Sequence, residues 1–149
     1  MNIKELNDQE LVRLEKLKKY QELGIDPFGQ KYKVSHSFSE IRELCKNKDA
    51  VKLEKFDLHV SVAGRIKAIR RMGKASFMNI QDKTGNMQVY LALDGLGEKN
   101  YELFKMADIG DIVGVTGVMN LTRTGELTIK AKKFTHLTKC LHPLPEKFH

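Results

Sequence analysis

The sequence predicts a β-rich (α+β) fold, in which five strands close into a Greek-key barrel with a helix between the third and fourth strands and a helical extension at the N-terminus. Three observations predict this fold. Apolar and polar residues alternate with period two in five stretches after residue 56, glycine-containing turns separate several of them, and helical spacing interrupts the series once. The 149 residues suffice for one packed domain of about 100 residues plus extensions.

Residues 1–55 predict a helical extension and a linker. Two capping boxes, in which a polar residue is followed three positions later by glutamate, mark helix starts. They predict one helix over residues 8–23 and a short helix that ends near Cys45, separated by the Gly- and Pro-containing linker of residues 24–32. The capping pairs are Asn7 with Glu10 and Ser37 with Glu40.

The barrel domain is expected over residues 56–138, and its first strand is long and half-buried. The alternation slips at Ile69. A bulge there would bury Ile69 and return Arg70 to the outer face of the strand, which already holds Arg65 and Lys67. The residues expected to face inward along this strand are Leu58, Val60, Val62, Ile66 and Ala68.

The second and third predicted strands carry an aromatic residue on their polar face. In the second strand, residues 74–82, Phe77 is out of phase with the apolar positions, so its ring should lie on the outer face. A DKTG turn leads to the third strand, where Gln88 and Tyr90 share this outer face with Phe77. The inward residues of the two strands are Ser76, Met78, Ile80, Met87, Val89, Leu91 and Leu93.

The remaining elements complete the barrel. Residues 98–107 have the apolar side of one helix, which would plug the open end of a barrel, and two further strands follow, joined by the hairpin TRTGE. A helix between strands three and four of a five-stranded barrel is the order of an OB-fold, whose outer face on strands two and three binds oligonucleotides. Residues 139–149 contain two prolines and no periodicity, so we expect an exit linker.

Charge favours a nucleic acid partner. The net charge is +7 and the pI is about 9.4, and no acidic residue interrupts the basic run from Arg65 to Lys74 beside Phe77. Bases stack on aromatic rings and phosphates attract cations, so the pattern suits single-stranded nucleic acid. A solvated basic edge with Phe77 packed under a loop is the alternative that the pattern leaves open. The expected phosphate contacts are Arg65, Lys67, Arg71 and Lys74.

Other classes of protein lack support in the sequence. Cys45 and Cys140 have no CxxC or Cys/His spacing, so we expect neither a disulfide framework nor a metal site, and a reducing cytoplasm is the default. No phosphate-binding glycine motif or hydrolase motif occurs, so no catalytic residue is expected. The N-terminus has no signal-peptide pattern, and no apolar run is long enough to span a membrane.

Three segments resemble the N-terminal part of class II lysyl-tRNA synthetases: RRMGKASFMNIQD at residues 70–82, TRTGELTI at 122–129 and LHPLPEKFH at 141–149. GIDPFGQKY at residues 24–32 fits the same family. The resemblance covers nearly the whole chain, and it implies an OB-fold domain that binds the anticodon stem-loop of tRNA(Lys).

The resemblance also implies roles for four residues. It places the aromatic residue that stacks on the central anticodon base at Phe77, a glutamine that reads the same uridine at Gln88, an arginine at Arg70 and a hairpin glutamate at Glu126. From the pattern alone, Glu126 is either an acceptor for a base or an ordinary hairpin-end carboxylate. Phe77, Gln88 and Arg70 lie on the outer face that the alternation had already selected.

The resemblance further implies that family members continue into a catalytic domain, which binds ATP, Mg²⁺ and lysine and forms a homodimer. None of the motifs of that catalytic domain occurs in these 149 residues. These 149 residues should therefore bind RNA as part of a lysine–tRNA ligase without aminoacylating by themselves. Three alternatives stay open: a free-standing OB-fold that binds single-stranded nucleic acid, an aspartyl- or asparaginyl-type ligase domain, and a protein-interaction module.

Overall fold

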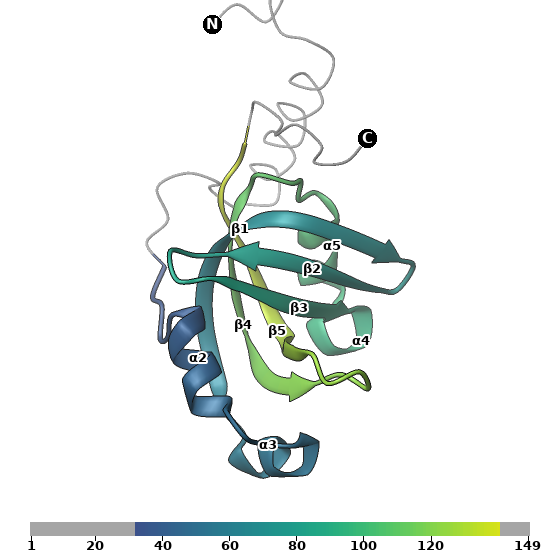
Figure 1. Cartoon of the computed structure of the whole chain (residues 1–149). Coiled ribbons are helices and arrows are strands. Elements are labelled where there is room, and N and C mark those ends of the chain that lie inside the picture. The colour runs from purple at the N-terminus through teal and green to yellow at the C-terminus, as the bar shows by residue number, and fades with distance from the viewer. Residues whose placement is uncertain (1–31, 141–149) are drawn as a thin grey trace, which may run out of the picture.

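The computed structural model describes residues 32–140, which form a closed five-stranded barrel with helices packed around it (Figure 1). The strands follow the order β1-β2-β3-β5-β4, and each neighbouring pair is antiparallel except β3 and β5. This arrangement confirms the predicted OB-fold. The elements are α2 (Phe38–Cys45), α3 (Ala50–Phe56), β1 (His59–Met72), β2 (Ala75–Gln81), β3 (Asn86–Ala92), α4 (Leu93–Leu96), α5 (Glu98–Lys105), β4 (Ile112–Leu121) and β5 (Leu127–Thr138).

Strand β1 is the longest strand and pairs with two partners. Its first half pairs with β4 and its second half with β2, and Arg65 lies where the two ladders meet. A bulge bends the strand, but it lies at Lys67, between Ile66 and Ala68, and not at Ile69 as predicted. Because Ala68 then pairs with Asn79, it is exposed on the outer face, and its predicted inward position is wrong.

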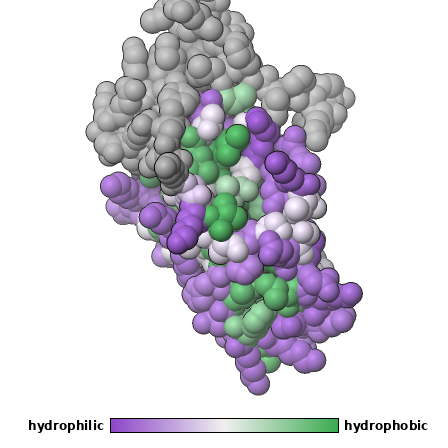
Figure 2. Space-filling model, turned by 90° about the vertical axis from the view of Figure 1, so that its left-hand side faces the viewer, coloured by the Kyte–Doolittle hydropathy of each residue, from purple (hydrophilic) through white to green (hydrophobic). Residues whose placement is uncertain are grey.

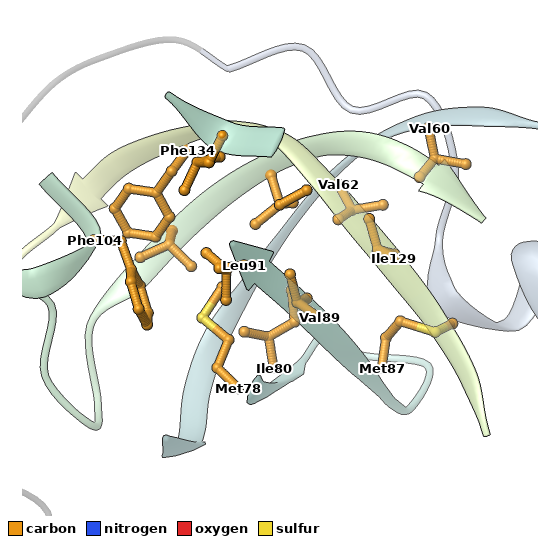
Figure 3. Close-up of a cluster of buried hydrophobic side chains, with 14 of the residues drawn as sticks. Val60, Val62, Met78, Ile80, Met87, Val89, Leu91, Phe104, Ile129 and Phe134 are labelled. Carbon is orange, nitrogen blue, oxygen red and sulfur yellow. The ribbon is translucent and has the colours of Figure 1, made fainter. Parts of the chain in front are cut away.

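The inward residues of the strands fill the barrel (Figure 3). Met78, Ile80, Met87 and Val89 are at most 2% exposed, as the alternation predicts. Burying a large apolar side chain fully stabilises the fold by roughly 1.5–3 kcal/mol. Phe104 of α5 is fully buried with its ring 5.8 Å from that of Phe134, so the helix predicted between strands three and four does cover the apolar interior.

The carboxylate of Asp82 joins helix α2 to the β2–β3 turn. Its predicted capping box is confirmed, since Ser37 and Glu40 exchange both hydrogen bonds. Asp82 Oδ2 accepts the backbone N–H of Phe38, while its Oδ1 accepts the N–H groups of the turn. Burial alone would raise the pKa of Asp82, but the hydrogen bond from the Thr84 hydroxyl and those from the backbone N–H groups outweigh it, and the pKa is lowered.

Two short helices were not predicted. Helix α3 begins at the cap of Asp49, and its side of the molecule shows small apolar patches among hydrophilic side chains (Figure 2). Strand β3 ends at Ala92, so Leu93 starts α4 instead of continuing the strand. The expected helix at 8–23, residues 24–31 of the linker and residues 141–149 lie outside the described residues, and the domain boundaries stay predictions. No helix among residues 32–140 is long and apolar enough to cross a membrane.

A buried ionic cluster joins the end of β5 to the loop before β4. Asp111 Oδ2 accepts hydrogen bonds from His136 Nε2 and Lys139 Nζ, each at 3.0 Å, and Lys139 also contacts Asp108 Oδ2 at 2.7 Å. The side chains of Asp111, His136 and Lys139 are fully buried. Burial alone would raise the pKa of Asp111, but the hydrogen bond from His136, the charge of Lys139 and two backbone N–H groups lower it.

We expect Asp111→Asn to lower the free energy of unfolding by up to about 3–5 kcal/mol, because it removes one of the two carboxylates that compensate the buried charge of Lys139 and leaves the partly exposed Asp108. Chemical denaturation near neutral pH measures this change. The matched control is Glu102→Gln, which breaks an exposed ion pair with Lys105 and should cost about 1 kcal/mol or less.

Asp111→Asn should also flatten the acid side of a plot of the free energy of unfolding against pH. A carboxyl whose pKa is lowered by folding contributes its stability above its ordinary pKa, and that stability is lost as the pH falls through the folded value. A loss for Asp111→Asn no larger than for Glu102→Gln would contradict a structural role for the cluster.

Candidate nucleic-acid interface

Two rows of side chains cross the outer face of the sheet. In the first row, the strand register aligns Arg70 of β1, Phe77 of β2, Tyr90 of β3 and Lys130 of β5. Two aromatic residues therefore lie between two cations. In the second row the same strands contribute Ala68, Asn79, Gln88 and Thr128. The bulge at Lys67 puts β1 in phase with this pattern.

An open hollow of about 430 Å³ lies between these rows and the β4–β5 hairpin. It brings together all four residues for which the resemblance implies a role in base recognition. We call it the Phe77 hollow. It is lined by Ala68, Ile69, Arg70, Phe77, Met78, Asn79, Gln88, Thr122, Thr124 and Glu126.

Phe77 forms the aromatic wall of this hollow. Its side chain is half-buried, and its ring centroid lies 5.1 Å from that of Tyr90 with the two planes tilted by 50°. A tilted aromatic pair of this kind is worth about 0.5–1.5 kcal/mol beyond the buried area. Tyr90 thus supports Phe77 from one side, and Phe77 lines the hollow on the other.

A hydrogen-bond relay orients the amide of Gln88. The hydroxyl of Thr128 donates to the backbone carbonyl of Glu126 at 3.1 Å, so its oxygen is left to accept. Gln88 Nε2 donates to that oxygen at 2.9 Å. Because the amide nitrogen faces Thr128, Oε1 and the second N–H of Gln88 have no hydrogen-bond partner among residues 32–140. One acceptor and one donor are therefore available at the hollow.

Arg70 and Glu126 both line the hollow and are exposed. The backbone of Glu126 is held by Thr122, whose Oγ1 accepts the Glu126 N–H and whose N–H donates to the Glu126 carbonyl. Within the described residues, the carboxylate of Glu126 and the guanidinium of Arg70 form no ion pair or hydrogen bond. Both charged groups are open to a ligand.

The four expected phosphate contacts do not form one group. Arg65 donates to the carbonyl of Gly110 at 2.9 Å, and Arg71 donates to that of Ala107 at 2.8 Å. The Arg71 guanidinium also lies over the ring of Phe104 at 5.0 Å, so it stabilises the covered end of the barrel. Lys67 lies in the bulge and Lys74 in the β1–β2 turn. Phosphate binding by these four residues, Arg65, Lys67, Arg71 and Lys74, stays a prediction.

Comparisons with known proteins agree with this geometry. Residues 60–137 match the family of OB-fold nucleic acid binding domains. The chain belongs to this family. This OB-fold chain is also 50% identical over 149 residues to a lysine–tRNA ligase of Bacillus cytotoxicus and 50% identical over 147 residues to one of Staphylococcus aureus. These matches span 100% and 97% of the chain but only 30% of each relative, and they confirm the resemblance to lysyl-tRNA synthetases.

Sequence reasoning missed three residues of this OB-fold site. Thr128 orients Gln88, Asn79 lines the Phe77 hollow, and Tyr90 supports the Phe77 ring. The alternation had placed Tyr90 on the outer face, whereas the relay through Thr128 depends on the parallel pairing of β3 with β5. Among residues 32–140, no group of three or more His, Cys, Asp and Glu side chains could hold a metal ion.

We predict that Thr128→Val releases the amide of Gln88. Valine has a similar shape but no hydroxyl, so the relay is broken, while the Glu126 carbonyl keeps its bond from Thr122. In nuclear magnetic resonance relaxation, the order parameter of the Gln88 side-chain amide should fall below about 0.6, the range of flexible groups. Thr128→Ser keeps the hydroxyl and should preserve the order, and an equally ordered amide in Thr128→Val would refute the relay.

Proposed function

We propose that this chain recognises the anticodon of tRNA(Lys) through the outer face of β1, β2 and β3, as the N-terminal domain of a lysine–tRNA ligase. One observation carries the proposal. Four side chains from four separate parts of the chain, Arg70, Phe77, Gln88 and Glu126, meet in one open hollow with hydrogen-bonding groups left unused. The 50% identity to lysine–tRNA ligases supports the choice of RNA.

The hollow suits an unpaired base. Proteins read RNA sequence mainly in loops, where a base can be turned out, stacked on an aromatic ring and read along its edge. Phe77 supplies the ring but cannot choose between bases, because every base has a π-face. Selectivity must come from the polar groups around it.

These polar groups suit uracil better than cytosine. Uracil presents an N–H between two carbonyl acceptors, whereas cytosine presents an acceptor ring nitrogen beside its amino group. Gln88 Oε1 can accept the uracil N–H, and the second N–H of Gln88 or the guanidinium of Arg70 can donate to a carbonyl. To pair with cytosine, the amide of Gln88 would have to flip so that its oxygen and nitrogen exchange places. The relay through Thr128 opposes this flip, because Thr128 accepts from Gln88 Nε2.

The remaining functions are proposed for a longer protein. The chain spans 30% of the length of the lysine–tRNA ligases that it matches. We propose that such a protein acts as a homodimer that activates lysine with ATP and Mg²⁺ and transfers it to tRNA(Lys), using residues outside this span. A cytoplasmic location is supported by the thiol of Cys45, which forms no disulfide, and burial raises the pKa of Cys45 and keeps it protonated.

We predict that Phe77→Ala weakens binding of a UUU anticodon stem-loop by about 1–3 kcal/mol, the range for loss of base–aromatic stacking. Phe77 is half-buried on the outer face, so the fold should persist. Titration at fixed salt measures affinity, and circular dichroism measures folding.

Phe56→Ala provides the matched control, because Phe56 is also a partly exposed aromatic residue, 40% exposed, but lies on α3 away from the hollow. Its affinity should equal that of the unaltered chain. Equal affinities for Phe77→Ala and Phe56→Ala would remove Phe77 from the site. A linear uridine oligomer that binds as tightly as the stem-loop would favour a general single-strand binder.

We predict that Gln88→Ala reduces the preference for a central U over a central C more than it reduces overall affinity. A site built for a polar edge loses roughly 1–3 kcal/mol of discrimination when the matching group is removed. The measurement compares two stem-loops that differ only in the central base, on the unaltered chain and on the variant.

Gln81→Ala is the control for this comparison, since Gln81 is an exposed glutamine on β2 that does not line the Phe77 hollow. It should leave the U-over-C ratio unchanged. If the ratio is also unchanged in Gln88→Ala, base selection lies elsewhere and the proposed role of Gln88 fails.

A further inference from the structure

A second carboxamide lies beside Gln88 in the Phe77 hollow. Asn79 of β2 is the register partner of Gln88 of β3, and both side chains are half-buried and line the hollow. Side chains directly opposite each other in an antiparallel pair have Cβ atoms about 4.5–5.5 Å apart. The two amides are therefore close enough to contact one base together. The resemblance implies a role for Gln88 but none for Asn79.

The amide of Asn79 has unused hydrogen-bonding groups. It forms no hydrogen bond with any residue between 32 and 140, and none joins it to Gln88. A carboxamide carries two N–H donors and an oxygen that can accept twice. Because Asn79 lines the hollow, a base bound there would take the place of solvent around this amide.

Gln88 alone cannot satisfy the edge of a uracil. That edge presents three groups in a row: a carbonyl, an N–H and a second carbonyl. The bond from Gln88 Nε2 to Thr128 leaves one acceptor and one donor, which match the N–H and one of the carbonyls. A carbonyl that loses solvent without gaining a donor weakens binding. The second carbonyl therefore needs a donor from another residue.

Among the residues that line the hollow, Asn79 is best placed to supply this donor. The hydroxyls of Thr122 and Thr124 already bond to each other at 3.1 Å. Arg70 is exposed and belongs to the neighbouring row of side chains. Asn79 lies in the same row as Gln88, on the strand that pairs with it.

We propose that Asn79 donates to the carbonyl of the central base that Gln88 leaves unpaired, so that two neighbouring amides bind one pyrimidine edge; this inference rests on the proposed anticodon recognition. The two amides differ in freedom. The relay through Thr128 fixes Gln88, whereas no hydrogen bond within residues 32–140 fixes Asn79, whose amide can turn to donate or to accept. Asn79 therefore adds affinity for uracil and cytosine alike, and Gln88 makes the choice between them.

Asn79→Ala removes the proposed donor. Affinity for stem-loops with a central U and with a central C should fall by a similar factor, roughly two- to tenfold, the range for one neutral hydrogen bond. The U-over-C ratio should stay unchanged, in contrast to Gln88→Ala. Asn86→Ala is the matched control, because Asn86 is an exposed asparagine on β3 that does not line the hollow, and it should bind like the unaltered chain. Circular dichroism establishes that each variant is folded.

Replacement of single atoms in the base identifies the partner of Asn79. Stem-loops with 2-thiouridine or 4-thiouridine at the central position carry sulfur, a weak acceptor, in place of one carbonyl oxygen. With one of these two bases, the loss of affinity caused by Asn79→Ala should disappear, because the accepting oxygen is already missing. With the other base, the loss should equal that measured with uridine.

The outcomes separate this inference from the function on which it rests. If Asn79→Ala leaves the affinity unchanged, or weakens the binding of uridine and both thiouridines equally, the contact of Asn79 with the base is refuted and recognition through Phe77 and Gln88 stands. A fall in the U-over-C ratio as large as that in Gln88→Ala would refute the adaptable role of Asn79. If no stem-loop binds the unaltered chain, or if binding does not depend on Phe77, both proposals fail.

Discussion

The bulge at Lys67 is the constraint on which the recognition face depends. Side chains of a strand alternate between its two faces, so a single extra residue exchanges the faces for every residue that follows. With the bulge, Ile69 pairs with Met78 on the core side and Arg70 pairs with Phe77 on the outer side. Without it, Ile69 would face solvent and the guanidinium of Arg70 would point into an apolar barrel, which is strongly unfavourable.

The site is built from two parts of the chain. Strands β2 and β3 hold Phe77, Tyr90 and Gln88 at fixed register, while the β4–β5 hairpin brings Glu126 to the edge of the same hollow. Thr128 joins the two parts, since it bonds both Gln88 and the Glu126 carbonyl. The buried cluster around Asp111 fixes the other end of β5, so the strand is anchored by packing and charge away from the recognition face.

Local patterns predicted much of this structure, and long-range pairing supplied the rest. Alternation placed Phe77 and Gln88 outside, and the capping box of Ser37 and Glu40 marked α2 correctly. The bulge was predicted at the wrong residue, because the sequence shows only that the phase of the alternation changes between Ile66 and Ile69. No local pattern contains the neighbours on which the other contacts depend. Thr128 lies 40 positions from Gln88, and Arg65 and Arg71 donate to carbonyls more than 30 positions along the chain.

The most direct test of the account is to locate the central anticodon base on the protein. A UUU stem-loop with 5-iodouridine at its central position can be cross-linked by light to the aromatic residue on which that base stacks, and mass spectrometry then identifies the attached peptide. We expect a cross-link to Phe77. Efficient cross-linking to residues of α2 or α3, with none on β2 or β3, would contradict it.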